Sequence, residues 1–345
     1  MVEIKTPAGE QDLALWYAEA GVADLRPAAA VPAPGQALVR MLWSGLSRGT
    51  ERLVFNGLVP ASEYERMRAP LQEGAFPFPV KYGYCAVGVV EAAETPDLVG
   101  RNVFCLHPHQ TRFAAPLAML TPLPAHLPPR RAVLAANMET ALNALWDSGA
   151  GPGDRVVVVG AGLVGLLVAY LAAGLPGADV TVVDLDASRR AIAESFGARF
   201  ATPADFGAPG DADVVFHASA SAPGLGVALG AAGLEARVVE LSWYGEGEVA
   251  APLGGAFHSR RLTLVSSQVG HVAPTRRPRW SYARRLGKAL ELLADPRLEA
   301  LITQDVSFED LPEALPRLLA PGAKGLATVV KYASPRADDS QSAEI

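Results

Sequence analysis

The chain has 345 residues, half of them apolar, and a formal net charge of −6. This length favours two domains, or one domain split by an insertion. The acidic balance excludes the basic face of a nucleic-acid-binding protein, and the short arginine run at residues 276–279 is expected to be a solvated loop. Two cysteines, Cys85 and Cys105, are too few for a disulfide framework or a four-thiolate zinc site. The first residues do not have the layout of a secretion signal, so we expect a protein of the reducing cytoplasm.

The first 130 residues have the pattern of a β-rich, barrel-like domain. Residues 37–43 and 86–91 are apolar runs typical of strands, and prolines and glycines are scattered between such runs. A cluster of prolines at residues 122–129 marks the end of this part.

From residue 131 onward, helix and strand patterns alternate. Helices are predicted over residues 131–148, 163–173 and 187–196, and strands over residues 156–159, 180–183, 213–216 and 237–241. The continuous apolar strands suit a parallel sheet that is covered on both faces. The alternation predicts an α/β fold of the doubly wound, Rossmann type. Residues 156–178 carry no charge, but their internal glycines indicate a strand, a turn and a buried helix instead of a membrane span.

After residue 266 the pattern changes again. A long amphipathic helix is predicted over residues 282–294, followed by a strand over residues 326–330. The simplest account returns this part of the chain to the first domain. The predicted division is a β-rich domain at 1–130, a Rossmann domain at 131–265 and a return segment at 266–333, with a polar tail at 334–345 that we expect to be disordered.

Between the strand at 156–159 and the helix at 163–173 lies the pattern G-x-G-x-x-G. In this context the pattern predicts a dinucleotide-binding turn. Gly160 permits the tight turn, Gly162 lets the backbone approach the diphosphate, and Gly165 allows close packing of helix and strand. The free N–H groups of the helix start, including those of Leu163 and Val164, would then face the phosphates.

The choice of cofactor depends on Asp184, which ends the next strand 19 residues after Gly165. Its carboxylate can accept hydrogen bonds from the ribose hydroxyls of NAD and would repel the 2′-phosphate of NADP. Arg189 lies close enough in the sequence to attract that phosphate. NAD is therefore the predicted cofactor, and NADP stays open as an alternative.

The order of a β-rich domain, a G-x-G-x-x-G domain and a return segment resembles the medium-chain dehydrogenase/reductase superfamily, the alcohol dehydrogenase architecture with its GroES-like catalytic domain. The resemblance implies three ligand positions for a catalytic zinc. In this chain those positions hold Ser47, Tyr84 and Ala136, which do not form a zinc site. The four cysteines of a structural zinc lobe are absent too, so no metal is expected.

Several runs resemble a narrower branch, that of 2-desacetyl-2-hydroxyethyl bacteriochlorophyllide a dehydrogenase. They are residues 44–51 (SGLSRGTE), 81–84 (KYGY), 107–110 (HPHQ), 137–141 (NMETA) and 266–270 (SSQVG). The branch implies oxidation of a secondary alcohol beside a ring, and the superfamily implies dimers or tetramers of identical chains.

Without a metal, other groups must handle the proton of the alcohol. By the resemblance, Tyr84 replaces a zinc ligand and could reach the substrate oxygen, or it is a buried structural tyrosine. His107 falls at a pocket-lining position and could pair with Tyr84 as a proton relay, or it is a loop histidine. Glu139 is either an acid/base or a carboxylate at a helix start. Ser47 either hydrogen-bonds the substrate oxygen or merely replaces a cysteine, whereas a structural role is favoured for His109.

Two further residues are assigned to the cofactor through the resemblance. Arg48 takes a position where a basic residue binds the diphosphate, with a surface arginine as the alternative. Thr140 is expected to pack against the nicotinamide ring, with a core helix position as the alternative.

The sequence therefore predicts a zinc-independent, NAD-dependent oxidoreductase that acts on a small molecule, a secondary alcohol or its ketone. One alternative is a reductase of activated C=C bonds, similar to quinone oxidoreductases. The other is a dinucleotide-binding sensor without catalysis. Neither a nucleic acid nor a membrane is an expected partner.

Overall fold

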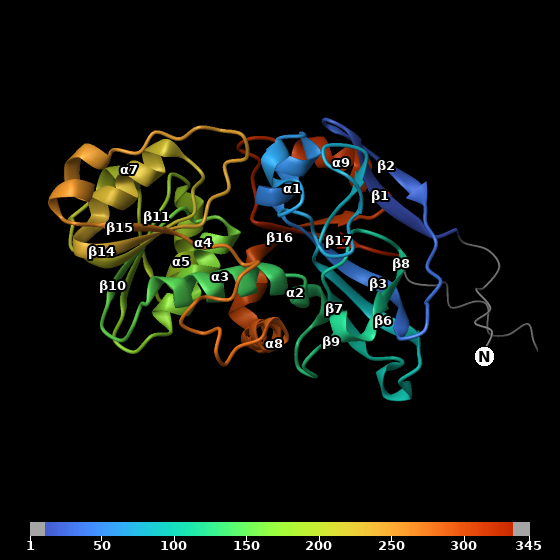
Figure 1. Cartoon of the computed structure of the whole chain (residues 1–345). Coiled ribbons are helices and arrows are strands. Elements are labelled where there is room, and N and C mark those ends of the chain that lie inside the picture. Colours follow the sequence, from blue (N-terminus) through green and yellow to red (C-terminus); the bar gives the residue numbers. More distant parts are fainter. Residues whose placement is uncertain (1–10, 334–345) are drawn as a thin grey trace, which may run out of the picture.

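The computed structural model describes residues 11–333, so the tail predicted at 334–345 lies outside the described residues. Figure 1 shows two lobes side by side, with α2 (Pro129–Ala132), α3 (Ala135–Ser148) and α8 (Tyr282–Leu292) between them. One lobe is built on a parallel sheet and the other on strands that are antiparallel except for the parallel pair of β16 and β17.

The first lobe contains a six-stranded parallel sheet in the order β12-β11-β10-β13-β14-β15. The strands are β10 (Arg155–Val159), β11 (Asp179–Val183), β12 (Arg199–Ala201), β13 (Ala212–His217), β14 (Ala232–Glu240) and β15 (Thr263–Ser266). The helices are α4 (Leu163–Ala173), α5 (Arg190–Ser195), α6 (Pro203–Phe206) and α7 (Ala222–Ala231). The four valines of β10 are buried, which confirms the predicted parallel sheet with two covered faces.

The second lobe contains a seven-stranded sheet and a four-stranded sheet. The larger sheet has the order β16-β17-β3-β6-β7-β9, with β8 also paired to β3, and the smaller one the order β2-β1-β5-β4. The elements are β1 (Leu13–Glu19), β2 (Val22–Pro27), β3 (Gln36–Leu46), α1 (Arg48–Phe55), β4 (Glu73–Gly74), β5 (Val80–Lys81), β6 (Ala86–Ala93), β7 (Asn102–Cys105), β8 (Arg112–Pro116), β9 (Thr121–Pro122), β16 (Ile302–Ser307), α9 (Leu311–Leu318) and β17 (Ala327–Lys331). The predicted fold class, a β-rich domain beside a Rossmann domain, is confirmed.

The last part of the chain contacts both lobes. Strand β17 pairs antiparallel with β3, and its Thr328 lies opposite Leu46. Helix α8 packs instead on α3, where Arg285 forms a buried ion pair with Glu139. The residues just before β17 contact the start of α1, because Arg48 donates a hydrogen bond to the carbonyl oxygen of Gly325 (2.9 Å).

Two predicted helices are shorter than expected. The helix predicted over residues 131–148 is divided into α2 and α3, which are separated at the buried residues Val133 and Leu134. The helix predicted over residues 187–196 begins with a 3₁₀ turn and becomes α-helical only at Arg190. The predicted end of that helix is correct, since Gly197 follows it with a φ of +91°.

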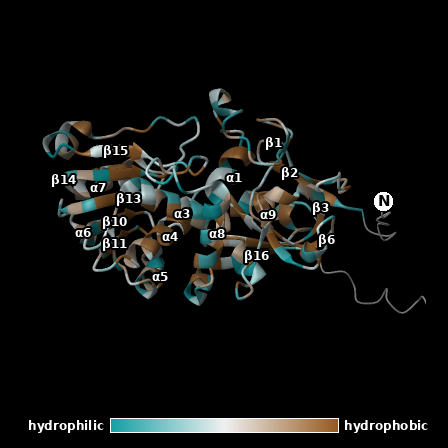
Figure 2. Ribbon diagram, turned by 60° about the horizontal axis from the view of Figure 1, so that its bottom comes forward, coloured by the Kyte–Doolittle hydropathy of each residue, from teal (hydrophilic) through white to brown (hydrophobic). Residues whose placement is uncertain are grey.

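Helix α4 is apolar on all sides because it is buried between the sheet and α3. Figure 2 shows its ribbon and the adjacent strands as largely hydrophobic. Within residues 11–333, none of the helices combines the length and apolar character needed to cross a membrane.

Candidate functional site

A cavity of about 350 Å³ lies between the two lobes and is lined by residues from both. Its walls come from the start of α4, from the loops after β13 and β14, from the turn into α1, and from α3. The lining residues are Leu46, Ser47, Arg48, Gly49, Thr50, Arg52, Tyr84, Asn137, Thr140, Gly162, Leu163, Val164, Ala218, Ala220, Leu241, Ser242, Trp243, Gly325 and Leu326. We call this cavity the cleft.

The glycine turn at one end of the cleft has no room for side chains at two of its three glycines. Gly160 has a φ of +109°, and a Cβ there would lie 2.7 Å from the backbone nitrogen of Ser219. A Cβ on Gly165 would lie 1.9 Å from the carbonyl oxygen of Gly160. Gly162 faces open space and caps the start of α4, so the free N–H groups of that helix point toward the cleft.

Asp184 holds the glycine turn from the edge of the sheet. Its carboxylate accepts hydrogen bonds from the backbone N–H groups of Ala161 (2.6 Å) and Asp186 (2.8 Å). One acid therefore connects the turn to the loop after β11, where the ribose of a dinucleotide is expected to bind.

Two arginines from different lobes meet at the rim of the cleft. Arg48 and Arg189 both donate to the carbonyl oxygen of Gly325, at 2.9 and 3.0 Å. Burial lowers the pKa of Arg48, and the positive charges of Arg189 and Arg52 lower it further. An anion bound beside these arginines would offset the repulsion between their positive charges, and the diphosphate of a dinucleotide is an anion of this kind.

At the other end of the cleft, the hydroxyl of Tyr84 donates a hydrogen bond to Oγ of Ser47. Burial raises the pKa of Tyr84 above its ordinary value, although hydrogen bonding with the side chains of Ser47 and Thr50 opposes the rise. The phenol therefore stays protonated near neutral pH and can act as a hydrogen-bond donor. Both side chains line the cleft, as does Thr140, whose hydroxyl donates to the carbonyl of Ala136 (2.9 Å).

Directly behind Ser47 lies a fully buried carboxylate, that of Glu51. Its Oε1 accepts the backbone N–H of Ser47 (2.7 Å), and its Oε2 accepts the hydroxyl of Tyr17 (2.6 Å) and lies 3.1 Å from Nε2 of His109. The other ring nitrogen of His109 lies 2.7 Å from Oγ of Ser44. His109 is thus structural, as favoured from the sequence, whereas the sequence assigned no role to Glu51.

The structure does not place His107 in the cleft. Its side chain is 5% exposed and stacks on Phe113 with ring centroids 3.9 Å apart, while Nδ1 lies 2.8 Å from the carbonyl of Pro108. Burial lowers the pKa of His107 to about 3. The proposed relay between Tyr84 and His107 is therefore wrong, because Tyr84 is bonded to Ser47 instead.

Neither role predicted for Glu139 is correct. The residue lies beyond the first turn of α3, and its carboxylate accepts a hydrogen bond from Nε of the buried Arg285 (2.9 Å). Burial raises the pKa of Glu139, and the charge of Arg285 opposes that rise. Asn143, one turn further on, accepts from the same guanidinium (2.6 Å), so this face of α3 is directed at α8 and away from the cleft.

Several lining residues were missed in the sequence. Asn137 precedes Thr140 by three positions, which puts both on one face of α3. Ala218 and Ala220 follow β13, and residues 241–243 follow β14. The rule that ligands bind at the carboxyl ends of parallel strands could have found these loops.

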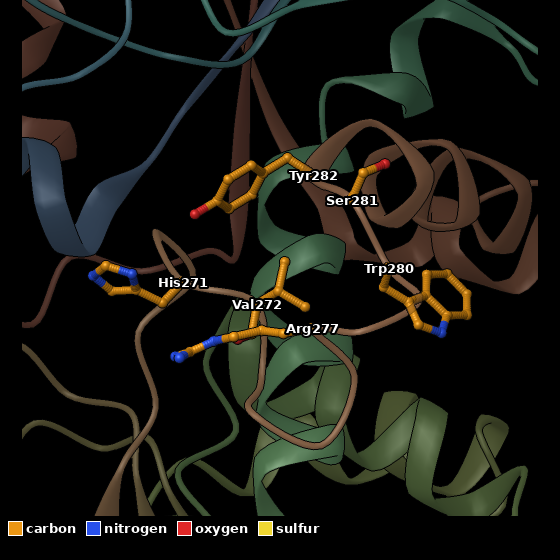
Figure 3. Close-up of a pocket in the computed structure, with 6 residues that line it drawn as sticks. All are labelled: His271, Val272, Arg277, Trp280, Ser281 and Tyr282. Carbon is orange, nitrogen blue, oxygen red and sulfur yellow. The ribbon is translucent and has the colours of Figure 1, made fainter.

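A smaller hollow of about 190 Å³ lies beside the start of α8 and contains none of the residues that line the cleft. Figure 3 shows that His271, Arg277 and the hydroxyl of Tyr282 point to one side of it, and that Trp280 points away. Arg277 donates to the carbonyl of Val272 (2.8 Å) and is exposed, as the prediction of a solvated arginine run requires.

Comparison with known families matches residues 147–238 to the C-terminal domain of the alanine dehydrogenase/PNT family. The matched part extends from the end of α3 to β14. It includes the glycine turn and Asp184.

Solved structures share the architecture of the whole described chain. A candidate zinc-binding dehydrogenase of Sinorhizobium meliloti 1021, bound to NADP, has a TM-score of 0.76 at 19% identity and covers 94% of this chain and 100% of its own. An alcohol dehydrogenase of Escherichia coli CFT073, complexed with NADH, has a TM-score of 0.72 at 16% identity, with 94% and 100% covered. The 2R,3R-butanediol dehydrogenase of Bacillus subtilis has a TM-score of 0.72 at 19% identity, with 93% and 99% covered. At these identities the likeness establishes the fold of a dehydrogenase.

Proposed function

We propose that this protein is an NAD-dependent, zinc-independent oxidoreductase that transfers a hydride between a secondary alcohol or its ketone and a nicotinamide. The observation that carries the proposal is the composition of one cleft. A phosphate-binding glycine turn forms one end, and the hydrogen-bonded pair of Tyr84 and Ser47 forms the other. The relatives bound to NADP and to NADH support a nicotinamide cofactor.

The dinucleotide would be held by groups along the whole cleft. The amides at the start of α4 suit the diphosphate, together with Arg48, while Asp184 suits the ribose and Thr140 the nicotinamide ring. When bound, the nicotinamide supplies or accepts the hydride. The protein must then deliver or remove one proton at the substrate oxygen.

Tyr84 is our candidate for that proton step. Its hydroxyl is neutral, faces the cleft and is oriented by Ser47, whose backbone is in turn held by Glu51. In the reduction of a ketone, the phenol would turn its one hydroxyl hydrogen from Ser47 to the carbonyl oxygen, while the Ser47 hydroxyl donates to the phenol oxygen in its place, and would so stabilise the developing alkoxide. In the reverse direction, the alcohol would give its proton to the oxygen of Tyr84 as the phenol passes its own hydrogen to Ser47, whose hydroxyl hydrogen would leave to solvent in the cleft.

Zinc does not suit the donor set at this end of the cleft. Two of the three positions that the superfamily uses for ligands hold hydroxyls bonded to each other, and the third is Ala136. Burial raises the pKa of the neighbouring Cys85 thiol well above its ordinary value, which disfavours the thiolate that zinc requires. Within residues 11–333, no group of three or more histidines, cysteines, aspartates and glutamates is arranged to bind a metal ion.

NAD is proposed over NADP because of Asp184, while Arg189 is already engaged. Arg189 lies 3.2 Å from the carboxylate of Asp186 and donates to Gly325. Both acids lie where a 2′-phosphate would approach, and their charge opposes it.

The experiment is a titration of the purified, tag-free chain with NADH and NADPH, followed by assays with cyclic secondary alcohols, their ketones and an α,β-unsaturated ketone. We expect tighter binding of NADH, turnover with the alcohol or ketone, and far less than one zinc per chain after dialysis. Stoichiometric zinc or tighter NADPH binding would contradict the proposal. Turnover only with the unsaturated ketone would favour a C=C reductase, and binding without any turnover would favour a sensor.

A further inference from the structure

A pair formed by a buried histidine and a partly exposed glutamate lies beneath the wall of the cleft that the parallel sheet provides. His217 ends β13 and Glu240 ends β14, and the two residues are direct neighbours across these parallel strands. Nδ1 of the fully buried His217 lies 2.6 Å from Oε2 of Glu240, and Nε2 lies 2.7 Å from Oγ of Ser219. The imidazole therefore connects the Glu240 carboxylate at the end of β14 to the Ser219 hydroxyl in the loop after β13.

The same carboxylate also holds the loop that follows β14. Oε1 of Glu240 accepts the backbone N–H of Ser242 (2.8 Å), and the hydroxyl of Tyr244 donates to Oε2 (3.1 Å). Burial raises the pKa of Glu240, but hydrogen bonds from His217 and Ser242 outweigh it, so the pKa lies below its usual range. Glu240 is consequently ionised near neutral pH, and its charge is shared among donors from the end of β13 and from the loop after β14.

The loop after β13 is strained where it faces the cleft. Ala220 has a φ of +50°, an unfavourable conformation for a residue with a side chain, and its N–H donates to Oγ of Ser242 (3.0 Å). The loop is also packed on two sides, because a Cβ on Gly160 or on Gly224 would clash with Ser219. A strained backbone persists where surrounding contacts determine it, and such positions concentrate at ligand sites.

We infer that Glu240 and His217 are positioning residues that hold residues 218–220 and 241–243 in the shape that binds the nicotinamide half of the dinucleotide. Both loops line the cavity that Tyr84 and Ser47 also line, so they belong to its reacting end. The inference rests on the proposed function, because it assumes a dinucleotide in the cleft. It predicts that the pair affects ligands that carry nicotinamide and leaves ADP-ribose, which lacks the ring, unaffected.

The two nitrogens of His217 can be tested separately. Because the carboxylate of Glu240 has no hydrogen to give, Nδ1 carries the hydrogen and Nε2 accepts the hydroxyl hydrogen of Ser219. An asparagine at position 217 places its amide nitrogen near the site of Nδ1, whereas a glutamine reaches the site of Nε2. His217→Asn therefore keeps the donor to Glu240, and His217→Gln loses it.

The experiment measures the affinity of the full chain for NADH by fluorescence titration, and that for ADP-ribose by calorimetry. Glu240→Gln and His217→Gln should weaken NADH binding at least about tenfold, as expected when charge-assisted hydrogen bonds that set a binding surface are lost. His217→Asn should stay within about threefold of the unmutated chain, and so should the matched control Glu235→Gln, which changes an exposed carboxylate of β14 outside the pair and the two loops. ADP-ribose affinity should change less than about twofold in all four variants.

Several outcomes would overturn the inference. Equal weakening of NADH and ADP-ribose would assign the pair a merely structural role, and equal effects of His217→Asn and His217→Gln would exclude the link through Nδ1. Unchanged NADH affinity in Glu240→Gln would show that the carboxylate does not position the loops. If the unmutated chain binds ADP-ribose and NADH equally poorly, the proposed function itself is wrong, so the two failures are distinguishable. Melting temperatures of the variants report whether they are folded.

Discussion

Two glutamates, one behind each wall of the cleft, are held by the same three kinds of group. Glu51 lies in the β-rich lobe and Glu240 in the parallel-sheet lobe. Each accepts a tyrosine hydroxyl and a serine backbone N–H and lies beside a histidine ring nitrogen. The partners are Tyr17, Ser47 and His109 for Glu51, and Tyr244, Ser242 and His217 for Glu240.

We call each glutamate with its tyrosine, serine and histidine an anchor. The two anchors differ in the group that donates a hydrogen bond to the serine Oγ. Oγ of Ser47 accepts the phenol hydroxyl of Tyr84, whereas Oγ of Ser242 accepts the backbone N–H of Ala220. A phenol can give up its proton during a reaction, and a backbone amide cannot. The same arrangement of a carboxylate with a tyrosine, a serine and a histidine can therefore support proton transfer on one wall and only loop shape on the other.

Replacing Tyr84 by phenylalanine should produce the largest effect on turnover. The variant removes the Tyr84 hydroxyl, which is the proton donor that Ser47 and Glu51 support. The ring stays packed beside Tyr82. Positioned acid/base groups contribute about 100- to 10,000-fold, so we expect turnover to fall at least ~100-fold. The affinity for NADH should change less than about twofold. A near-normal rate in a steady-state assay would show that the proton leaves by another route.

Replacing each glutamate by alanine should lower the free energy of unfolding by a different amount in the two anchors. Glu51 is fully buried, and Glu51→Ala leaves Tyr17, His109 and the N–H of Ser47 without an acceptor. We expect it to destabilise the protein by about 3–5 kcal/mol, because each buried donor left without an acceptor costs about 1–3 kcal/mol.

Glu240→Ala is the matched comparison. The Glu240 side chain is 16% exposed, so water can replace part of what is lost, and about 1–3 kcal/mol is expected. Denaturation by urea, followed by far-UV circular dichroism, measures both variants. Equal midpoints for the two variants would mean that burial does not distinguish these anchors.

The sequence predicted the fold and the glycine turn at one end of the cleft because both depend on local patterns. Runs of valine form the parallel strands, and the steric demands of the turn are visible in Gly160 and Gly165 themselves. The reacting end depends on the direction in which side chains point, and an alignment of motifs gives only their place along the chain. His107 has the right place, but its ring is stacked on Phe113.

Helix α3 shows how much of this direction was present in the sequence. Asn137 and Thr140 are three positions apart and form one stripe, whereas Glu139 and Asn143 are four apart and form another. The helical period defines both stripes, but it does not say which one faces the cleft. That choice depends on Arg285, which returns more than 140 residues later to pair with the second stripe.

Asp184 should set the strength and the selectivity of cofactor binding. Asp184→Ala removes an acceptor for the ribose and also frees the N–H of Ala161 in the glycine turn. Loss of hydrogen bonds to a charged group costs ~1.5–3 kcal/mol, which corresponds to roughly ten- to a hundredfold weaker NADH binding. NADPH affinity should fall less, so the preference narrows. An unchanged ratio of the two affinities would place the selectivity elsewhere, with Arg189 as the next residue to replace.

His107 should have the smallest effect on turnover, although a histidine near a cleft is the usual candidate for acid/base chemistry. His107→Phe keeps a ring against Phe113 and should leave turnover within about twofold, because the imidazole does not face the cleft.

The effect of His107→Phe should instead appear in the pH dependence of the free energy of unfolding. The pKa of His107 is about 3 in the folded protein and near 6.5 when unfolded, so between these values the unfolded chain binds more protons. Stability is therefore complete above pH 6.5 and falls as the pH drops toward 3, by about 1 kcal/mol per pH unit from this residue. His107→Phe should flatten that slope in urea denaturation between pH 6.5 and 4.5. If the slope is unchanged and turnover falls tenfold or more, the imidazole is in the reaction after all, and the distinction between Tyr84 as the proton donor and His107 as a core residue fails.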